Sequence, residues 1–495
     1  MTATPKGGHH PRGLAGIEFL TLEGGGGKGG AYLGAVIALE ELGLLPIKAT
    51  GKRQIRGIAG ASAGAATAFL LAIGQTSENM WKSIIGQEFL DFLDGPEHGV
   101  ARSATFIDDT LPAAAADRTG GKIKRTVKID LNDRTKLPAT VIKTLVVLVA
   151  LLQKDHKAKT GDHIADLIAG TILKGVSAAG AKSKAYQHIA TAIKKDPGGY
   201  LMNLAFDPGI FPAFAVREFL ARQLVVRLKV SVPPPPPSTT EEDLLKLAKR
   251  LTFEQFFDLT KVDLVVAGTN LSTGRPAYFS RSTTAKFPVV DAVGLSMSIP
   301  IFFKALYLDT KDKKYDAFRG WWGDGGIVNN FPLHAFNGYD SGGLKLDSFA
   351  RGSLPINPAT LGLVLDDGDV AQFGVEQKPM KDFPGSMGLI GPVLDALMFT
   401  STEGQIRNAN ERNQTVRLNA FFLGTYDLAV DPVVVAASVP EARAKIYDCL
   451  LRPRPAASKA ILKTLNTYVT ANLKALAEAT KPKYCDKVKR DWANI

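Results

Sequence analysis

The chain has 495 residues, of which 45% are hydrophobic and 22% are charged. A chain of this length and composition can bury a large core, which excludes a wholly disordered protein and predicts two or three structural units. Its net charge of +12 favours polyanionic partners, but no zinc-finger spacing or RNA-binding aromatic motif supports nucleic acid, so an anionic membrane surface is the expected partner.

Targeting features are scarce. Residues 1–13 are polar and lack the apolar core of a signal peptide, so we expect a flexible N-terminus. The apolar run Thr144–Leu152 is too short for a membrane span, which needs about 20 residues. Cys449 and Cys485 are too few for a disulfide framework and do not have the pattern of a metal site; we expect free thiols, and a single bridge between them is the alternative. We therefore expect a cytoplasmic or peripheral membrane protein, and export by a specialised secretion route stays open.

The N-terminal elements alternate between strand and helix. The apolar patterns predict strands at Ile17–Leu22 and Gln54–Ala59, each followed by a helix, at Ala31–Leu42 and Ala63–Ile73. This order is typical of an α/β fold with parallel strands.

The middle of the chain differs, because helical patterns replace strand patterns. Helices are predicted at Met80–Leu93, Thr140–Gln153, His163–Ile172 and Phe214–Val226. We interpret residues 95–250 as a basic helical insertion that ends at the proline run Pro233–Pro237. That run is a stiff spacer or, alternatively, a ligand for a proline-binding domain. The insertion itself is a lid, a membrane-docking surface or an ordinary subdomain.

The α/β pattern then resumes. Strands are predicted at Val262–Thr269, Pro276–Ser280, Ala317–Trp322, Thr360–Leu365 and Val416–Phe422. Helices are predicted at Val289–Ser298, at Val393–Asn410 and within the tail Glu441–Ala479.

The first candidate site is the turn Gly60-Ala61-Ser62-Ala63-Gly64, which lies between a strand and a helix. This is the geometry of a nucleophile elbow, where Gly60 and Gly64 leave room for a strained turn. Ser62 is therefore a candidate nucleophile, and the alternative is an ordinary helix N-cap.

The glycine-rich loop Gly24-Gly25-Gly26-Gly27-Lys28-Gly29 has three interpretations. A phosphate-binding P-loop fails, because Leu22 and Gly29 occupy positions that require Gly and Ser or Thr. A dinucleotide fingerprint fits the glycine spacing, but the next strand ends in the serine turn and offers no carboxylate for a ribose. An oxyanion hole is the third interpretation, in which Lys28 fixes the loop or favours anionic head groups.

A serine nucleophile requires a base. His9 and His10 precede Ser62, whereas a Ser-acid-His order places the histidine last. His98, His156, His163 and His188 lie in or near the insertion, and His334 is expected to be a buried helix-start residue. The alternative base is Asp324, because Gly323, Gly325 and Gly326 let its carboxylate approach another loop, although Asp-Gly is also a common turn.

Together, these three motifs in this order resemble the patatin-like phospholipase family. The stretches Asp263–Asn270, Gly294–Phe303 and Gly323–Pro332 are also similar to the family. The resemblance implies a three-layer α/β sandwich with a mostly parallel sheet, a catalytic domain at 14–345 that contains the insertion, and a mainly helical C-terminal extension at 346–495. The long insertion, and Lys28 where many members have Arg, are departures.

The resemblance also implies a mechanism. Ser62 and Asp324 would act as nucleophile and general base, Gly25 and Gly26 would hold the oxyanion, and water would release the acyl-enzyme. The expected substrate is a phospholipid or other lipid ester, with phospholipase A or lysophospholipase activity and no cofactor. Alternatives are a neutral-lipid or general carboxylesterase, a catalytically idle basic membrane-binding protein, and a nucleotide-binding oxidoreductase. The oligomeric state stays open.

Overall fold

The computed structural model describes most of the chain outside the expected insertion. The described residues are 9–48, 54–86, 89–93, 100–101, 103–105, 123–124, 191, 200, 209–231, 235–300, 302–310, 312–340, 343–344, 356–374, 402–425, 430–455 and 459–495.

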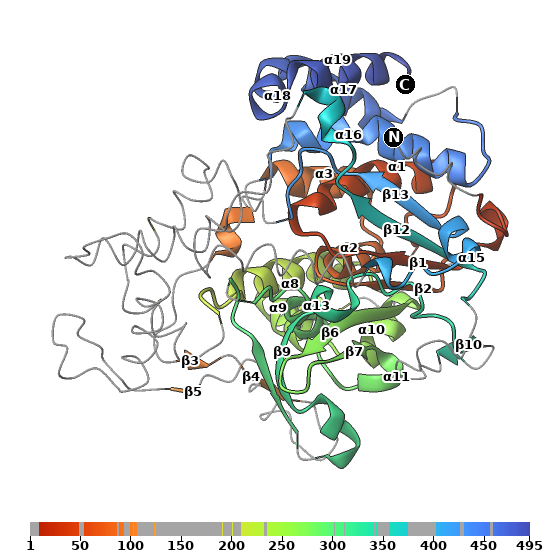
Figure 1. The fold of residues 1–495 in the computed structure, drawn as a ribbon. Coiled ribbons are helices and arrows are strands. Elements are labelled where there is room, and N and C mark those ends of the chain that lie inside the picture. Colours follow the sequence, from red (N-terminus) through yellow and green to blue (C-terminus); the bar gives the residue numbers. More distant parts are fainter. Residues whose placement is uncertain are drawn as a thin grey trace, which may run out of the picture.

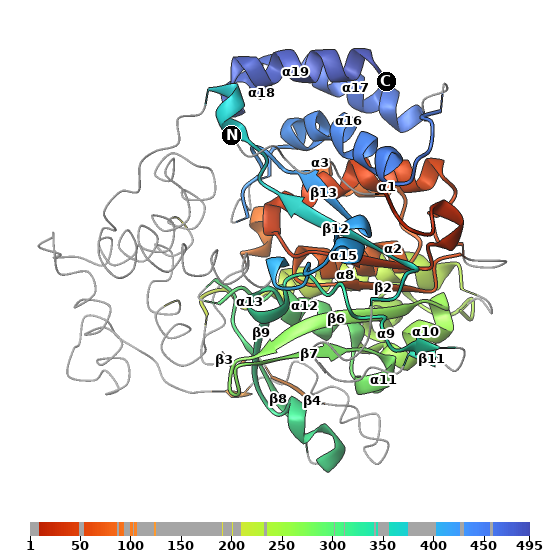
Figure 2. The ribbon, with the colours of Figure 1, turned by 45° about the vertical axis from the view of Figure 1, so that its right-hand side comes forward.

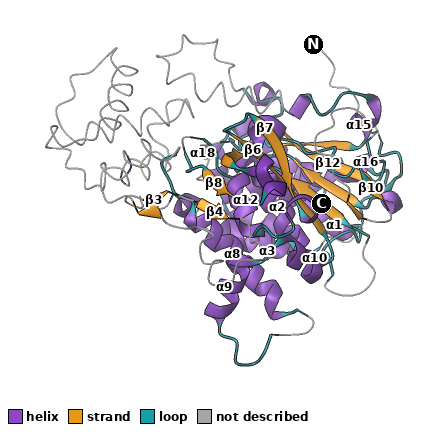
Figure 3. Cartoon of the chain, turned by 90° about the horizontal axis from the view of Figure 1, so that it is seen from below, coloured by secondary structure: helices purple, strands orange, loops and turns teal. Residues whose placement is uncertain are grey.

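A nine-stranded sheet forms the centre of the fold, and its order is β13-β12-β1-β2-β6-β9-β8-β4, with β7 paired to β6. The strands are β1 Phe19–Leu22, β2 Gly57–Gly60, β4 Ser103–Thr105, β6 Asp263–Asn270, β7 Arg275–Phe279, β8 Leu306–Asp309, β9 Gly320–Asp324, β12 Thr360–Asp366 and β13 Thr415–Asn419. The neighbouring strands β13, β12, β1, β2 and β6 are all parallel, and β4 is parallel to β8. Both β7 and β9 run antiparallel to β6, and β8 runs antiparallel to β9. The predicted α/β fold with a mostly parallel central sheet is confirmed. Figure 3 shows β4 and β8 at one edge of the sheet.

Both faces of the sheet are buried, because successive side chains of a strand point to opposite sides. In β6, Leu264 and Val266 belong to the large core beneath the helices, whereas Val265 and Ala267 belong to a smaller core on the other face. Phe336 covers this second face and stacks on Phe19, with ring centroids 4.6 Å apart.

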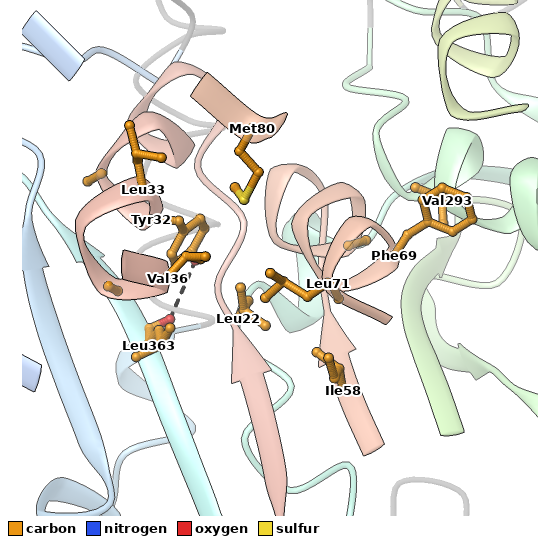
Figure 4. Packing of buried hydrophobic residues seen from close by; sticks show 14 of the residues in the cluster. Leu22, Tyr32, Leu33, Val36, Ile58, Phe69, Leu71, Met80, Val293 and Leu363 are labelled. Atoms are coloured by element: carbon orange, nitrogen blue, oxygen red, sulfur yellow. Dashed lines mark hydrogen bonds between the residues drawn. The ribbon is translucent and has the colours of Figure 1, made fainter. Parts of the chain in front are cut away.

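Helices cover the first face. They are α1 Tyr32–Glu41, α2 Ala63–Ala72, α3 Ser77–Gly86, α8 Phe214–Lys229, α12 Val289–Ser296 and α16 Pro432–Cys449. Helix α2 packs on β1, β2 and β6, and α12 packs on β6. Figure 4 shows Leu71 of α2 and Leu22 of β1 packed between this helix and the sheet.

The C-terminal part of the chain completes the same sheet. β12 pairs with β1, and α16 packs on α1 through the buried ion pair between Arg443 and Glu41, whose Nε and Oε2 are 2.7 Å apart. Helices α17 Ala460–Ala471, α18 Leu473–Ala479 and α19 Pro482–Ala493 lie outside α16 (Figures 1 and 2). The expected boundary at residue 345 therefore falls within one sheet. The N-terminal residues 9–13 are tied to this region, because His10 is buried and donates its backbone N–H to Cys449 O.

Only part of the expected insertion lies among the described residues. Helices α8 and α9 (Glu241–Arg250) occupy its end, and the predicted helix Phe214–Val226 corresponds to α8. Three short strands that the sequence did not predict, β4, β3 (Val100–Ala101) and β5 (Ile123–Lys124), occupy its start. The predicted helices Thr140–Gln153 and His163–Ile172, and with them the apolar run Thr144–Leu152, lie outside the described residues. Helix α3 and the 3₁₀ helix Phe89–Phe92 replace the single predicted helix Met80–Leu93.

The short elements around the sheet complete the fold. They are α10 Phe253–Thr260, α11 Arg281–Thr284, α13 Gly326–Asn329, α15 Ala409–Asn413, the hairpin of β10 Tyr339–Asp340 and β11 Gly343–Leu344, and the 3₁₀ helices Leu14–Gly16, Gly26–Ala31, Lys313–Phe318 and Val370–Phe373.

Two further local predictions were wrong. The strand Ala317–Trp322 begins only at Gly320, because a 3₁₀ helix occupies Lys313–Phe318 and Gly320 turns the chain with a φ of 124°. Residues 393–401 of the predicted helix Val393–Asn410 lie outside the described residues, and its described end is interrupted, because Asn408 caps a new helix by accepting the Glu411 N–H at 3.0 Å.

Candidate active site

Ser62 lies on a strained turn between β2 and α2. Its φ of 49° and ψ of −125° are unusual for a residue with a side chain. A Cβ on Gly60 would lie 2.2 Å from Gly64 O, and a Cβ on Gly64 would lie 2.4 Å from Glu23 O. The turn therefore requires glycine at both flanking positions.

Asp324 meets Ser62 from the end of β9. Ser62 Oγ donates a hydrogen bond to Asp324 Oδ2 at 2.7 Å, and the two side chains are separated by 262 positions in the sequence. Both residues are nearly inaccessible, with 3% and 2% of their surface exposed. The structure thus brings the predicted nucleophile and the predicted base into direct contact.

The surroundings of Asp324 tune its protonation. Burial raises the pKa of this carboxyl from 3.8 to about 7, while hydrogen bonds from the Ser62 hydroxyl and the Gly326 N–H act in the opposite direction. The Gly326 N–H donates to Asp324 Oδ1 at 2.7 Å, so each carboxylate oxygen has one donor. A carboxylate with this pKa can accept a proton near neutral pH.

Ser296, at the end of α12, connects the serine turn to the sheet. Its hydroxyl accepts the Ser62 backbone N–H at 2.9 Å and donates to Ala267 O at 2.6 Å. The Ser296 carbonyl also accepts the Gly325 N–H at 3.3 Å. The side chain of Ser296 therefore positions Ser62, and the backbone carbonyl of Ser296 positions Gly325, the residue after Asp324.

The glycine-rich loop lies against Ser62. A Cβ on Gly24 would lie 2.9 Å from Ser62 Cβ, so only glycine permits this approach. The backbone N–H groups of Gly24 and Gly27 donate to Asn330 O and Thr425 O. Within the described part of the chain, the N–H groups of Gly25 and Gly26 donate to no protein acceptor. The loop that contacts Ser62 therefore carries backbone donors without a protein acceptor among the described residues, which is what an oxyanion hole requires.

A buried carboxylate, Glu23, anchors this loop. Its Oε1 accepts hydrogen bonds from Asn330 Nδ2 at 3.1 Å and from Thr402 Oγ1, and its Oε2 accepts the Leu365 N–H at 2.5 Å. Burial raises the pKa of the Glu23 carboxyl from 4.5 to about 7, against the lowering effect of these hydrogen bonds and of the charges on Lys28 and Arg417. Glu23 thus ties the loop to β12 and to the segment after Asp324.

Lys28 has a partner of its own. Its Nζ lies 2.5 Å from Asp367 Oδ1, just beyond β12, and its side chain is only 17% exposed. Of the two roles expected for Lys28, this contact corresponds to fixing the loop.

An apolar pocket opens at Ser62, with a volume of about 170 Å³. Several elements contribute apolar side chains to its walls, among them Ala66 and Leu70 from α2, Met80 and Ile84 from α3, Val216, Phe219 and Leu220 from α8, Met297, Ile299 and Phe303 from the segment after α12, and Val435 from α16. Helix α8 belongs to the expected insertion, so that insertion contributes a wall of the site.

The described histidines have other partners. His334 Nε2 lies 3.1 Å from Gln405 O, and its Nδ1 lies 3.0 Å from Asn337 Nδ2. His9 and His10 lie near Asp448 O and Thr360 O. The remaining four, His98, His156, His163 and His188, fall outside the described residues. Where the structure describes a histidine, it is not the partner of Ser62.

Two kinds of feature are absent from the described residues. These residues contain no group of three or more His, Cys, Asp or Glu side chains that could hold a metal ion. None of their helices combines the length and apolar character needed to span a membrane.

Sequence reasoning missed Glu23, Ser296 and the pocket wall from α8. Ser296 lies in the stretch Gly294–Phe303, which was singled out as a whole, but no pattern distinguishes this serine from Ser298. Glu23 follows a buried strand, and an acid at a strand end gives no sign that it will be buried.

Comparisons with known proteins identify the family. A family model described as patatin-like phospholipase matches residues 20–337. A cGAMP-activated phospholipase of Vibrio cholerae serotype O1 is 28% identical over 181 residues, which cover 35% of this chain and 45% of that protein. The probable lipid hydrolase 463L of Invertebrate iridescent virus 6 is 29% identical over 88 residues, which cover 18% of this chain and 27% of that protein. The chain spans less than half the length of these curated relatives.

Solved structures show more distant similarity. VipD from Legionella pneumophila is 15% identical, with 96% of this chain and 80% of that chain covered and a TM-score of 0.39. ExoU from the type III secretion system of Pseudomonas aeruginosa, in its complex with SpcU, is 17% identical, with coverages of 93% and 59% and a TM-score of 0.33.

Proposed function

The chain belongs to the patatin-like phospholipase family, and from this premise we propose that it hydrolyses ester bonds of phospholipids or other lipids through a Ser62–Asp324 dyad. The observation that carries the proposal is the 2.7 Å hydrogen bond from Ser62 Oγ to Asp324 Oδ2, together with the apolar pocket that Ser62 lines. The pocket offers the acyl chain an apolar environment, while the dyad faces the ester carbonyl.

Acylation begins when Ser62 Oγ attacks the ester carbonyl carbon and its proton moves to Asp324 Oδ2. The carbonyl oxygen becomes an oxyanion, which the Gly25 and Gly26 N–H groups stabilise. Collapse of this intermediate breaks the bond to the alcohol, and Asp324 returns the proton to the leaving oxygen. The product is an acyl-Ser62 ester and a free alcohol or lysolipid.

Deacylation repeats these steps with water. Asp324 accepts a proton from the water that attacks the acyl carbon, and the same two N–H groups stabilise the second oxyanion. Collapse breaks the bond to Ser62 Oγ, which regains the proton from Asp324. The fatty acid leaves, and the dyad returns to its starting state.

The head group of the substrate is not specified by the pocket, because its described walls contact the acyl chain. Phospholipase A or lysophospholipase activity is our first choice on the family, and a neutral-lipid or general carboxylesterase is the alternative. Product analysis with mixed vesicles of phosphatidylcholine, phosphatidylglycerol and triacylglycerol distinguishes them, since free fatty acid would appear with lysolipid in the first case and with diacylglycerol in the second.

We also propose peripheral contact with anionic membranes, on the basis of the net charge of +12. Sedimentation with phosphatidylglycerol vesicles, compared with phosphatidylcholine vesicles, tests this contact. Equal binding to both would remove the electrostatic argument.

The dyad is tested with Ser62→Ala and Asp324→Asn. Each is expected to lower kcat/KM for p-nitrophenyl butyrate by about 10⁴-fold, as the loss of a member of a catalytic constellation does. Ser282→Ala and Asp369→Asn are matched controls, because both residues are exposed in the described structure. Turnover that survives both dyad substitutions would refute the dyad mechanism. A wild-type protein that hydrolyses no ester would instead favour the idle membrane-binding protein or the nucleotide-binding enzyme.

A further inference from the structure

One face of α2 forms a continuous wall of the apolar pocket. Its pocket-lining residues are Ala63, Ala66, Thr67 and Leu70. Their residue numbers increase by three, one and three, so they share one side of the helix. The wall begins beside the nucleophile, because Ser62 immediately precedes the helix.

The other faces of α2 are occupied by the core. Figure 4 shows Leu71 directed toward Leu22 and the sheet, and Phe69 directed toward Val293 of α12. The Phe69 ring also stacks on Phe256, with centroids 5.7 Å apart. The face with Ala66 and Leu70 is therefore the one that remains for a ligand.

Two further helices oppose this face with the same spacing. They contribute Met80, Ser83 and Ile84 from α3, and Val216, Phe219 and Leu220 from α8. Together with Val435 of α16, these three helix faces surround one space with apolar walls, which suits an extended hydrocarbon chain.

We propose that α2 measures the length of the acyl chain, with Ala66 and Leu70 as the residues that determine chain-length specificity. This inference rests on the proposed hydrolysis at Ser62. An α-helix rises about 1.5 Å per residue, so Leu70 lies about 12 Å and Ala66 about 6 Å along the axis from Ser62. An extended chain built from C–C bonds of about 1.5 Å advances roughly 1.3 Å per carbon, which places Leu70 beside carbon nine and Ala66 beside carbon five.

The volume of the pocket indicates a shorter acyl chain than the length of the helix does. Its 170 Å³ slightly exceeds an apolar cavity of about 150 Å³ that accommodates the six carbons of benzene. The enclosed space therefore suits about seven carbons, and the helix length suits about nine. Together they bracket a medium acyl chain of seven to nine carbons.

The test is a series of p-nitrophenyl esters from butyrate to dodecanoate. For the wild-type protein, we expect kcat/KM to rise by up to about fourfold per added methylene and to stop rising at seven to nine carbons. In Ala66→Leu, three added carbons fill the channel near carbon five, so the rise should stop there. In Leu70→Phe, kcat/KM should still rise up to a chain of five carbons, and its plateau should begin about two carbons shorter than in the wild-type protein.

Ala477→Leu is the matched control, because Ala477 is also a partly buried helical alanine packed against the core. We expect it to reproduce the wild-type plateau. Thermal unfolding checks each variant, and Ala66→Met, with a more flexible side chain, takes the place of Ala66→Leu if the latter does not fold.

The outcomes separate this inference from the proposed function. If the wild-type protein hydrolyses none of the esters, the proposed function fails. If it hydrolyses them and the Ala66 variant retains the wild-type plateau, the role of α2 is refuted while the hydrolase remains. A plateau that moves with the substituted position supports the role of α2.

Discussion

Replacing Asp324 by asparagine should stabilise the protein above neutral pH while it abolishes catalysis. Burial raises the pKa of this carboxyl from 3.8 to about 7, so the folded state binds the proton more tightly than the unfolded state does. Stability therefore falls as the pH rises from about 4 to about 7, where the native carboxyl loses its proton. A pKa difference of about three units corresponds to about 4 kcal/mol.

Asparagine removes this charge and keeps both hydrogen bonds. Its side-chain oxygen can accept the Gly326 N–H, and its NH₂ group can donate to Ser62 Oγ, since the serine hydroxyl accepts as well as donates. We therefore expect Asp324→Asn to raise the free energy of unfolding by about 2–4 kcal/mol at pH 8. At pH 5 the gain should shrink to about 1–2 kcal/mol, because the native carboxyl is then protonated in the wild-type protein as well.

The assay is urea unfolding, followed by far-ultraviolet circular dichroism at pH 5 and pH 8, with Asp369→Asn as the control for an exposed aspartate. A gain in stability that grows with pH would show that the buried, ionised carboxylate destabilises the fold. Such a cost is typical of active sites, where stability is lower than it would be without the catalytic group. A loss of stability at pH 8, or an equal change at both values, would refute the reasoning.

Three further variants test the parts around the dyad. The two carboxylate oxygens of Glu23 accept hydrogen bonds from three donors, and Glu23→Gln leaves only one acceptor oxygen. We therefore expect the free energy of unfolding, measured with urea, to fall by about 1–3 kcal/mol. We also expect kcat for ester hydrolysis to decrease. Ser296→Ala removes the acceptor of the Ser62 N–H and the donor to Ala267 O, and we expect kcat to fall by roughly 10- to 100-fold because Ser62 is less firmly positioned. Gly26→Ala should abolish activity, since Gly26 has a φ of 52° and a Cβ would collide with Thr425 O; wild-type turnover by a folded variant would contradict the fixed loop.

The strands and helices near the N-terminus could be predicted because each is encoded by a short run of neighbouring residues. The runs around β1, α1 and α2 carry their own periodicity, and the glycines around Ser62 mark the elbow. The proximity of Ser62 and Asp324 was also predictable, through three motifs in a recognisable order, although no local pattern links residues 262 positions apart.

The rest depends on contacts that no short pattern encodes. β12 pairs with β1 across more than 300 residues, so the C-terminal part was separated from a sheet that it completes. Helix α8 is basic along its length and was assigned to the insertion, yet Val216, Phe219 and Leu220 line the pocket. The burial of Glu23 arises from three distant donors, and it becomes visible only when β12, Asn330 and Thr402 are in place.

The central claim is that Asp324 activates Ser62, and the rate at which a fluorophosphonate probe labels Ser62 measures this activation directly. We predict that mass spectrometry will locate the label on Ser62, that the labelling rate will rise with pH through about 7 as Asp324 loses its proton, and that Asp324→Asn will nearly abolish labelling. Labelling that is equally fast in Asp324→Asn, or a label on another residue, would contradict the account.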